Sequence, residues 1–182
     1  PPAIADALVR LAGDAVDDGV VLDPACGAGE LLCAVFRRRR SLGQSAAAAM
    51  RGLTGWDLDA TAAWGARASL VLAAMERPTG APPDKVAVHG GVDALRRTFE
   101  ADAVVMNPPY LEAKRMRRAQ PGLREWLRDA FPELHGAFDL YMAFLHGAAR
   151  WLAPGGRVVA VLPNKVCQGR YAAAFRTEGP LS

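Results

Sequence analysis

The chain is predicted to fold as an α/β domain built on a doubly wound, mainly parallel sheet. Short apolar runs alternate along its 182 residues with segments whose apolar residues recur at helical spacing. This alternation is typical of parallel strands joined by crossover helices. Apolar residues make up 51% of the sequence, which is enough for one domain with a sizeable core.

The individual elements follow from the same patterns. Strands are expected at residues 20–22, 53–56, 86–88, 103–106 and 158–162. Helices are expected at residues 2–15, 30–40, 59–74 and 137–152, with one more from Tyr171 onward. Asp59 is placed to cap the third helix, and Pro154-Gly155-Gly156 is expected to stop the fourth. The polar stretch that ends near His135 is expected to be a long connection, which in a compact domain is usually functional.

The composition excludes several classes of protein. No apolar run is long enough to span a bilayer and no signal peptide is evident, so no membrane partner is expected. The three cysteines, Cys26, Cys33 and Cys167, lack metal-ligand spacing beside a His cluster. We therefore expect no metal site and a reducing, cytoplasmic compartment. The chain begins at Pro1 without an initiator Met, which suggests a fragment or an excised domain.

Two basic runs stand out against a net charge of only +3. The first is Arg37 to Arg40, and the second consists of Lys114, Arg115, Arg117 and Arg118. Basic patches attract nucleic acid, although a solvated helix face is the commoner explanation of such a run. The first run is interpreted as the end of a helix, where the helix dipole favours cations.

A glycine-rich turn joins the first predicted strand to its helix. It reads Asp23-Pro24-Ala25-Cys26-Gly27-Ala28-Gly29, and its glycines allow a tight turn close to a ligand. The loop lacks the GxGxxG spacing of dinucleotide-binding proteins, so a nicotinamide-dependent oxidoreductase is a weak alternative. It also lacks the Gly-Lys-Ser/Thr ending of a phosphate loop.

The second predicted strand ends at Asp57-Leu58. A carboxylate at this position suits the two hydroxyls of a ribose, and Leu58 offers an apolar surface to a purine. Together with the glycine turn, these residues predict a nucleoside ligand without a phosphate cradle, which fits S-adenosylmethionine. The purely structural interpretation is a tight turn with Asp57 as a helix cap.

Asn107-Pro108-Pro109-Tyr110 follows the fourth predicted strand. Proline cannot continue a central strand, so the chain must turn there. The Asn107 amide oxygen and a nearby carbonyl can hold both hydrogens of an –NH₂ group and direct its lone pair toward a methyl sulfonium. Tyr110 can stack on a flat base. This chemistry rests on positioning and electrostatics rather than on a strong base.

These motifs resemble those of the amino-methyltransferases, most closely the gamma-class N6-adenine DNA methyltransferases of restriction-modification and phage-defence systems. The resemblance covers nearly the whole chain and implies a Rossmann-like class I S-adenosylmethionine-dependent methyltransferase. It implies that the tetrapeptide Asn107, Pro108, Pro109 and Tyr110 is catalytic, and that adenine in DNA is flipped out of the duplex. The cofactor residues that it implies are Asp23, Pro24, Ala25, Cys26, Gly27, Gly29, Asp57, Leu58 and Asp93.

The resemblance also carries expectations about the rest of the protein. Residues 1–182 are expected to be a single catalytic domain, with an N-terminal helix (1–17), a cofactor half (18–100) and a catalytic half (101–182). The C-terminal hairpin strands and the target-recognition domain of the family are expected to be missing. A nuclease or specificity domain or subunit outside this chain is an expected partner. Asp139-Leu140-Tyr141 matches the segment that supports the family's site, and the second basic run is suspected to contact phosphates near the flipped base.

Other acceptors stay open at this point. Protein-glutamine methyltransferases that act on release factors share Asn-Pro-Pro-Tyr, and some guanine-N2 ribosomal RNA methyltransferases share both this motif and the glycine loop. A truncated, inactive methyltransferase fold that serves as a binding module is the alternative outside the enzymes. Asp139-Leu140-Tyr141 and the long basic segment favour DNA.

Overall fold

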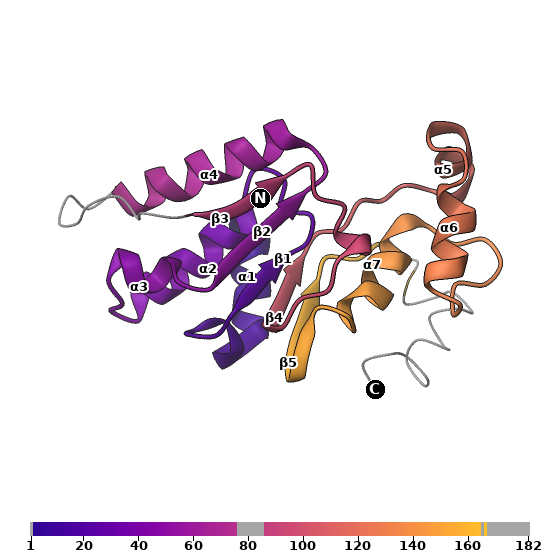
Figure 1. Ribbon diagram of the computed structural model, residues 1–182. Helices are drawn as coiled ribbons and strands as arrows, with labels where there is room; N and C mark the ends of the chain where they lie inside the picture. Colours follow the sequence, from indigo (N-terminus) through magenta and orange to yellow (C-terminus); the bar gives the residue numbers. More distant parts are fainter. Residues whose placement is uncertain (1, 76–85, 165, 167–182) are drawn as a thin grey trace. The chain divides into compact units, whose positions relative to one another are not determined.

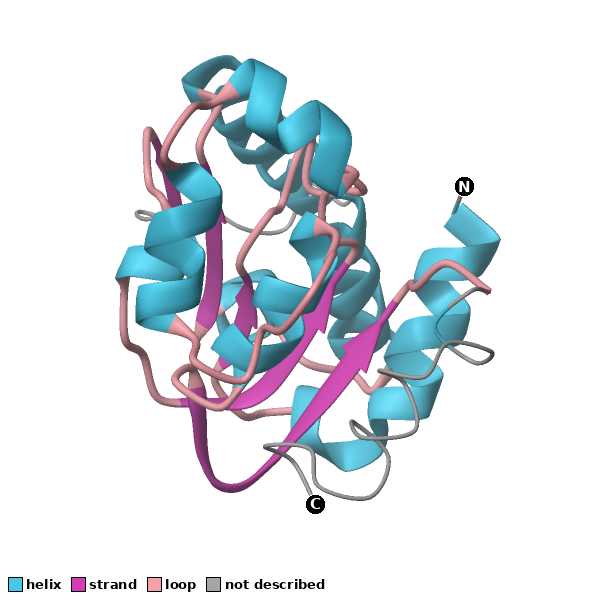
Figure 2. Cartoon of the chain, turned by 90° about the vertical axis from the view of Figure 1, so that its right-hand side faces the viewer, coloured by secondary structure: helices cyan, strands magenta, loops and turns pink. Residues whose placement is uncertain are grey.

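The computed structural model describes residues 2–75, 86–164 and 166, and its centre is one parallel sheet of five strands (Figure 1). The strand order is β3-β2-β1-β4-β5, so the direction of winding reverses between β1 and β4. The strands are β1 (Val21–Asp23), β2 (Leu53–Asp57), β3 (Ala87–Gly90), β4 (Ala101–Met106) and β5 (Leu152–Ala160). They lie side by side in the perpendicular view as well (Figure 2). The predicted α/β class with a doubly wound parallel sheet is confirmed.

Two compact units make up the chain. The first comprises Pro1–Asn107 and Trp151–Ala160 and contains the whole sheet. Its helical elements are α1 (Pro2–Ala12), η1 (Gly13–Val16), α2 (Glu30–Ser41), α3 (Ala46–Met50), α4 (Ala60–Met75) and η2 (Ala94–Arg96). The second comprises Pro108–Arg150 and Val161–Ser182, and its described helices are α5 (Ala113–Ala119), α6 (Leu123–Ala130) and α7 (Leu140–Ala148).

Strand β1, at the centre of the sheet, and its neighbour β4 are almost fully buried. All three residues of β1 are buried, and in β4 Asp102 alone is exposed. Strands that are covered on both faces show continuous apolar runs rather than alternation, which is the pattern that these segments have in the sequence. In the first unit α1 packs on α2, and α2 packs on α4, so these helices form one layer beside the sheet.

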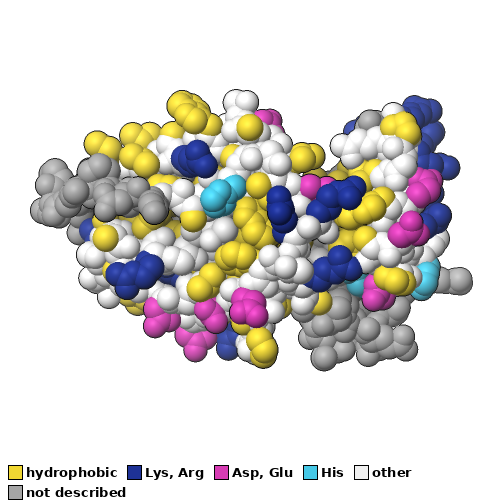
Figure 3. Space-filling model, viewed as in Figure 1, with side chains coloured by type: hydrophobic (Ala, Val, Ile, Leu, Met, Phe, Trp, Pro, Cys, Tyr) yellow, Lys and Arg dark blue, Asp and Glu magenta, His cyan; other side chains and the backbone are white. Residues whose placement is uncertain are grey.

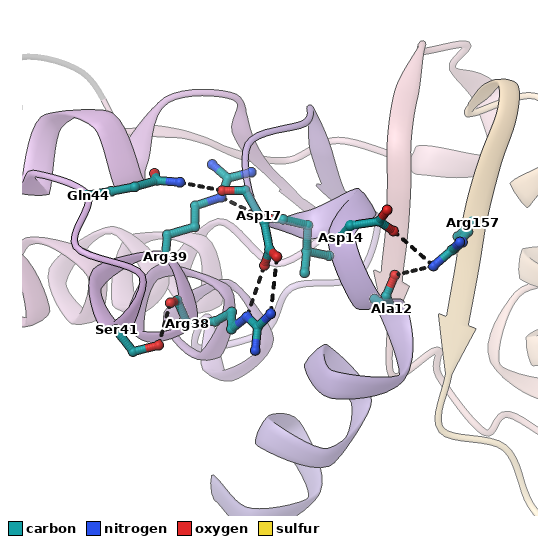
Figure 4. A network of polar contacts seen from close by, with 9 residues as sticks. Ala12, Asp14, Asp17, Arg38, Arg39, Ser41, Gln44 and Arg157 are labelled. Atoms are coloured by element: carbon teal, nitrogen blue, oxygen red, sulfur yellow. Dashed lines mark hydrogen bonds and ion pairs between the residues drawn. The ribbon is translucent and has the colours of Figure 1, made fainter.

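A buried arginine fastens the end of α2 to the amino-terminal side of the sheet (Figure 4). Arg39 is 0% exposed, and its guanidinium donates to the carbonyls of Val16 (2.7 Å), Gly19 (2.5 Å), Ala49 (3.2 Å) and Arg51 (2.6 Å). Burying a charged group is costly unless its N–H donors are hydrogen-bonded. Here four carbonyl oxygens accept from the guanidinium. These bonds join α2 to the segments that enter β1 and β2.

The other arginines of the first basic run also have partners. Arg37 pairs with Asp6 (3.0 Å), Arg38 forms a two-pronged pair with Asp17 (2.9 and 3.1 Å), and Arg40 donates to the Gln44 carbonyl. The run lies in the last turns of α2, as the sequence predicted, where cations also complement the helix dipole. Its side chains are therefore part of the scaffold.

Several predicted boundaries are wrong. Helix α7 spans Leu140–Ala148 instead of 137–152, and β5 begins at Leu152 instead of residue 158. Pro154-Gly155-Gly156 lies inside β5, where the register with β4 shifts between Ala101 and Ala103. Within the described sheet β5 lies at the edge, and an edge strand tolerates a proline and an irregular register. The expected long connection contains α5 and α6, and the helix expected from Tyr171 lies outside the described residues.

Candidate functional site

The carboxyl ends of neighbouring strands gather the polar residues of the candidate cofactor site. Strand β1 pairs with β2 on one side, where Asp23 lies opposite Gly55, and with β4 on the other, where Leu22 lies opposite Val104. Asp23, Asp57 and Asn107 therefore come at the same edge of the sheet, beside the position where the winding reverses. Ligands of such sheets bind at this edge.

The glycine turn is held close to the end of β2. The Cys26 amide donates to the Trp56 carbonyl at 2.9 Å, and the Gly29 amide donates to the Cys26 carbonyl at 2.8 Å. Gly29 has a φ of +86°, and a Cβ there would lie 2.9 Å from the Cβ of Ala66 in α4. Both the backbone conformation and the close approach of α4 therefore require glycine at this position.

Asp57 connects the two loops of this edge. Its Oδ2 accepts from the Gly27 amide and its Oδ1 from the Asp59 amide, both at 2.8 Å. The cap of α4 is Asp59, as predicted, whose Oδ1 accepts from the Thr61 amide at 2.8 Å. Asp57 thus fixes the glycine turn, a role that the sequence did not reveal. An ionised carboxylate has about four acceptor positions, so two backbone bonds leave capacity for a ligand diol.

Asp23 is a buried acid at the base of the turn. It is 1% exposed, and its Oδ1 accepts from the Ala25 amide at 3.2 Å. Burial raises the pKa of Asp23 to about 7, and the negative charge of Asp57 adds to the rise. The Cys26 thiol lies in the same environment, and burial together with the two acids raises its pKa to about 12. A thiol with that pKa stays protonated and is a poor nucleophile.

Leu58 and Asp93 lie in the loops after β2 and β3. Leu58 is 63% exposed, so its side chain is available as an apolar surface. Asp93 caps η2, and its Oδ1 accepts from the Leu95 amide at 3.2 Å while its Oδ2 accepts from the Arg96 Nε at 3.0 Å. The adjoining Val92 amide donates to the Asp57 carbonyl at 3.0 Å, which ties this loop to the end of β2.

The tetrapeptide follows β4 directly. Asn107 is exposed and is the last residue of the first unit, and Pro108 begins the second. Pro108 is buried and Pro109 is exposed. Because Met106 is 0% exposed, the chain passes at Asn107 from the buried interior of the sheet to the surface.

In the second unit, the Tyr110 ring is held at two places. Its hydroxyl donates to the Val161 carbonyl at 2.9 Å, and its ring lies edge-on to that of Tyr141, with centroids 6.3 Å apart and an interplanar angle of 62°. Tyr141 is fully buried, whereas Tyr110 is 47% exposed. Partial burial raises the pKa of Tyr110 above its usual value, so the hydroxyl remains a donor.

Asp139 links the start of α7 to the segment that follows the tetrapeptide. It is the N-cap residue of α7, yet its side chain makes no capping bond to its own helix. Its Oδ1 accepts instead from the Ala113 amide at 3.2 Å, and the next amide, that of Leu140, donates to the Leu111 carbonyl at 2.9 Å. The resemblance pointed to Asp139-Leu140-Tyr141 as a supporting segment, and these contacts show how it supports residues 111–113.

The second basic run forms most of α5. Lys114, Arg115, Arg117 and Arg118 are all exposed, and Met116 between them is 0% exposed. In Figure 3, Lys and Arg side chains gather where Figure 1 draws α5. The four cations make no ion pair with any residue that the structure describes.

The described residues contain neither a metal-binding cluster nor a membrane-spanning helix. No group of three or more His, Cys, Asp or Glu side chains in the described ranges is arranged to hold a metal ion. None of the helices in those ranges combines the length and the apolar content that crossing a membrane requires.

Similarity to known proteins covers both halves of the chain. Residues 92–178, just under half of the sequence, match the family model described as the Eco57I restriction-modification methylase. No curated protein sequence matches the chain. Three solved structures illustrate the similarity in fold, and the chain spans less than half the length of each.

The first is a Listeria monocytogenes protein assigned to the class I S-adenosylmethionine-dependent methyltransferases, with 18% identity over 94% of this chain and 47% of that chain, at a TM-score of 0.60. The second is the methyltransferase subunit of a type I restriction-modification system from Streptococcus thermophilus, with 21% identity over 97% and 37%, at 0.63. The third is the type IIL restriction-modification enzyme MmeI in complex with DNA, with 19% identity over 93% and 27%, at 0.65. The chain thus has the class I S-adenosylmethionine-dependent methyltransferase fold, and its expected resemblance to the restriction-modification methyltransferases is confirmed.

Proposed function

We propose that this chain transfers a methyl group from S-adenosylmethionine to the exocyclic N6 amine of adenine in DNA, as part of a restriction-modification or phage-defence enzyme. The observation that carries the proposal is that the glycine turn, Asp57 and Asn107 lie at one edge of the sheet. They follow the ends of β1, β2 and β4. The match to the restriction-modification methylase family includes the tetrapeptide.

The residues of the first unit fit this cofactor. The edge is rich in carboxylates, with Asp23 and Asp57 close enough to raise the pKa of Asp23, so it favours a cation over a phosphate. The remaining acceptor positions of Asp57 suit the ribose diol, the exposed Leu58 suits the purine face, and Asp93 suits the adenine amine. The turn formed by Pro24, Ala25, Cys26, Gly27 and Gly29 would lie against the amino acid part of the cofactor. When bound, S-adenosylmethionine supplies an electrophilic methyl group on a sulfonium.

The tetrapeptide supplies the substrate contacts. The Asn107 amide oxygen and the Pro108 carbonyl would accept the two hydrogens of the adenine amine, which turns the nitrogen lone pair toward the methyl group. Pro108 and Pro109 have no N–H group and restrict the backbone, so the two acceptors are held in place. The exposed part of the Tyr110 ring would stack on the flipped base.

The remaining features of the protein follow from the same proposal. Residues 1–182 act as one catalytic domain in the cytoplasm, with DNA as substrate. Recognition of a particular sequence, and any nuclease, belong to a domain or subunit outside this chain. The chain spans between 27% and 47% of the three structures described above, which leaves room for such parts in proteins of this kind.

The experiment is a transfer assay with a tritiated methyl donor and unmethylated genomic DNA. We expect label in DNA, recovered as N6-methyladenine after digestion. Asn107→Ala should abolish transfer while calorimetry shows nearly unchanged cofactor binding. Gln120→Ala is the control, because it removes an exposed amide outside the tetrapeptide.

Parallel incubations with ribosomal RNA and a release factor test the other amino acceptors. Label only in RNA or protein would overturn the choice of DNA. Cofactor binding without transfer to any acceptor would indicate a binding module. Wild-type turnover in Asn107→Ala would show that the role assigned to Asn107 is wrong.

A further inference from the structure

We propose that α5 binds the backbone phosphates of the DNA strand next to the nucleotide whose base stacks on Tyr110. The proposal rests on the function above and adds to it the surface that holds the substrate. It is carried by four observations on the described residues of the second unit.

The cations of α5 differ from the other basic run of the chain. Each arginine from Arg37 to Arg40 has a carboxylate or carbonyl partner, and Arg39 is completely buried. The four cations of α5 are exposed and make no ion pair with a described residue. The first run thus stabilises the fold, whereas no described residue forms an ion pair with the charges of α5.

The four cations share one side of the helix. At about 100° per residue, Lys114, Arg115, Arg117 and Arg118 occupy an arc of roughly 160°. Met116 lies on the opposite side of the helix and is 0% exposed. The helix therefore turns one anchoring side chain inward and presents a continuous basic surface outward.

This distribution of charge is unfavourable for the helix alone. Lys114 and Arg118 are four residues apart, and like charges at that spacing repel each other. The helix dipole acts in both directions here, because Lys114 and Arg115 lie near its positive end, beside the N-cap Glu112, whereas Arg117 and Arg118 lie in the last turn, where cations are favoured. A polyanion at this surface relieves the repulsion between the like charges.

The position of α5 relative to Tyr110 is fixed. Two residues separate Tyr110 from Ala113, the first residue of the helix. The Ala113 amide is bonded to Asp139, and the Leu111 carbonyl to the Leu140 amide. Since the Tyr110 hydroxyl also donates to the Val161 carbonyl, Tyr110 and α5 are both anchored within the second unit, and we therefore assign the phosphates to the strand that carries the stacked base.

The test measures the salt dependence of binding to a fluorescently labelled duplex of mixed sequence, by anisotropy between 50 and 300 mM KCl. Phosphate contacts are independent of sequence, so the recognition site need not be known. In Arg115→Gln/Arg118→Gln, the slope of log affinity against log salt should fall by about 0.9 for each lost contact, and affinity should weaken equally on unrelated sequences.

The control is Arg10→Gln/Arg51→Gln, which removes the same charge from exposed arginines of the first unit and should leave the slope unchanged. The proposal would be overturned if the α5 variant and the wild type had equal slopes, or if the control lost as much slope as the α5 variant. It would also be overturned if the slope changed only on duplex RNA, or if the wild type did not bind DNA at 50 mM KCl. Methyl transfer to DNA by the wild type, with an unchanged slope in the α5 variant, would refute only the role proposed for α5. A reduced slope in the α5 variant without methyl transfer by the wild type would refute only the proposed activity.

Discussion

The carboxylate of Asp57 accepts a hydrogen bond from the Gly27 amide at 2.8 Å, so the acid at the end of β2 directly shapes the glycine turn after β1. The two residues are thirty positions apart in the sequence. The conformation of the glycine turn therefore depends on Asp57 before any ligand binds at this edge of the sheet.

Asp57→Ala should weaken cofactor binding by about tenfold or more, because it removes both the proposed acceptor of the ribose hydroxyls and the bond to Gly27. Hydrogen exchange at the Gly27 amide should become faster at the same time. Calorimetry and exchange measurements check the two effects. Asp59→Ala is the matched control, since it removes the cap of α4, costs about 1 kcal/mol of stability and should leave affinity nearly unchanged. Equal losses of affinity in both variants would contradict the role of Asp57.

The contribution of Asp23 to the stability of the protein should fall as pH rises from about 4 to about 7. The pKa of Asp23 is raised from 3.8 to about 7, so between these values the folded state holds a proton that the unfolded state has lost. The contribution reaches up to roughly 4 kcal/mol and is flat above the folded pKa. Denaturant unfolding at several pH values measures it. Asp23→Asn should lose this part of the pH dependence, and an unchanged profile in that variant would disprove the assignment.

Cofactor affinity should rise over the pH range in which Asp23 ionises. A cationic ligand favours the charged carboxylate, so binding near pH 6 should release a proton, and affinity should level off above about pH 8. Calorimetry in buffers of different ionisation enthalpy reports the proton released. In Asp23→Asn, the release and the rise of affinity should both disappear. Proton uptake by the wild type would contradict the prediction.

Asp139→Ala should loosen the segment after the tetrapeptide without unfolding α7. Its side chain accepts from the Ala113 amide and makes no capping bond to its own helix. Exchange at the Ala113 amide should speed up in Asp139→Ala and change little in Asp139→Asn, which keeps an acceptor oxygen. Asp129→Ala, at an exposed position of α6, serves as control. Faster exchange in the control alone would show that the contact has no positioning effect.

Arg39→Met should lower the free energy of unfolding by about 3 kcal/mol or more, because buried carbonyls lose their donor. The guanidinium donates to four of them in the wild type. Arg37→Met on the same helix should cost less than about 1 kcal/mol, since its ion pair is exposed. Thermal and denaturant unfolding of the two variants give the comparison, and similar losses would contradict the importance assigned to the buried bonds.

The sequence predicted the central part of the fold because its signals are local. The predicted segments 20–22 and 103–106, which largely coincide with β1 and β4, are apolar throughout, and the turns that follow them contain glycine or proline. Helices α5 and α6 were missed because they are short and polar, so that neither fills a window long enough to show helical periodicity. The start of β5 was missed because Pro154 and Gly155 normally end an element, whereas an edge strand accepts them.

The candidate site could be located from the sequence but not described in detail. The rule for open α/β sheets places ligands at strand ends, which is why Asp23, Asp57 and Asn107 could be selected. The bond between Asp57 and Gly27 depends on the pairing of β1 with β2, which the sequence does not specify. The two basic runs also look alike in the sequence, because the partners of Arg38 and Arg39 lie ten or more residues away.

On α5, the buried Met116 serves packing, whereas the exposed cations are free of that requirement. Among the described side chains of α5 it alone is buried, so the outward positions can change identity without disturbing packing. Relatives of this chain can therefore acquire stronger or weaker attraction for a polyanion through single surface replacements. On the role proposed for α5, selection can tune residence time on DNA at these positions while the glycine turn and the tetrapeptide remain as they are.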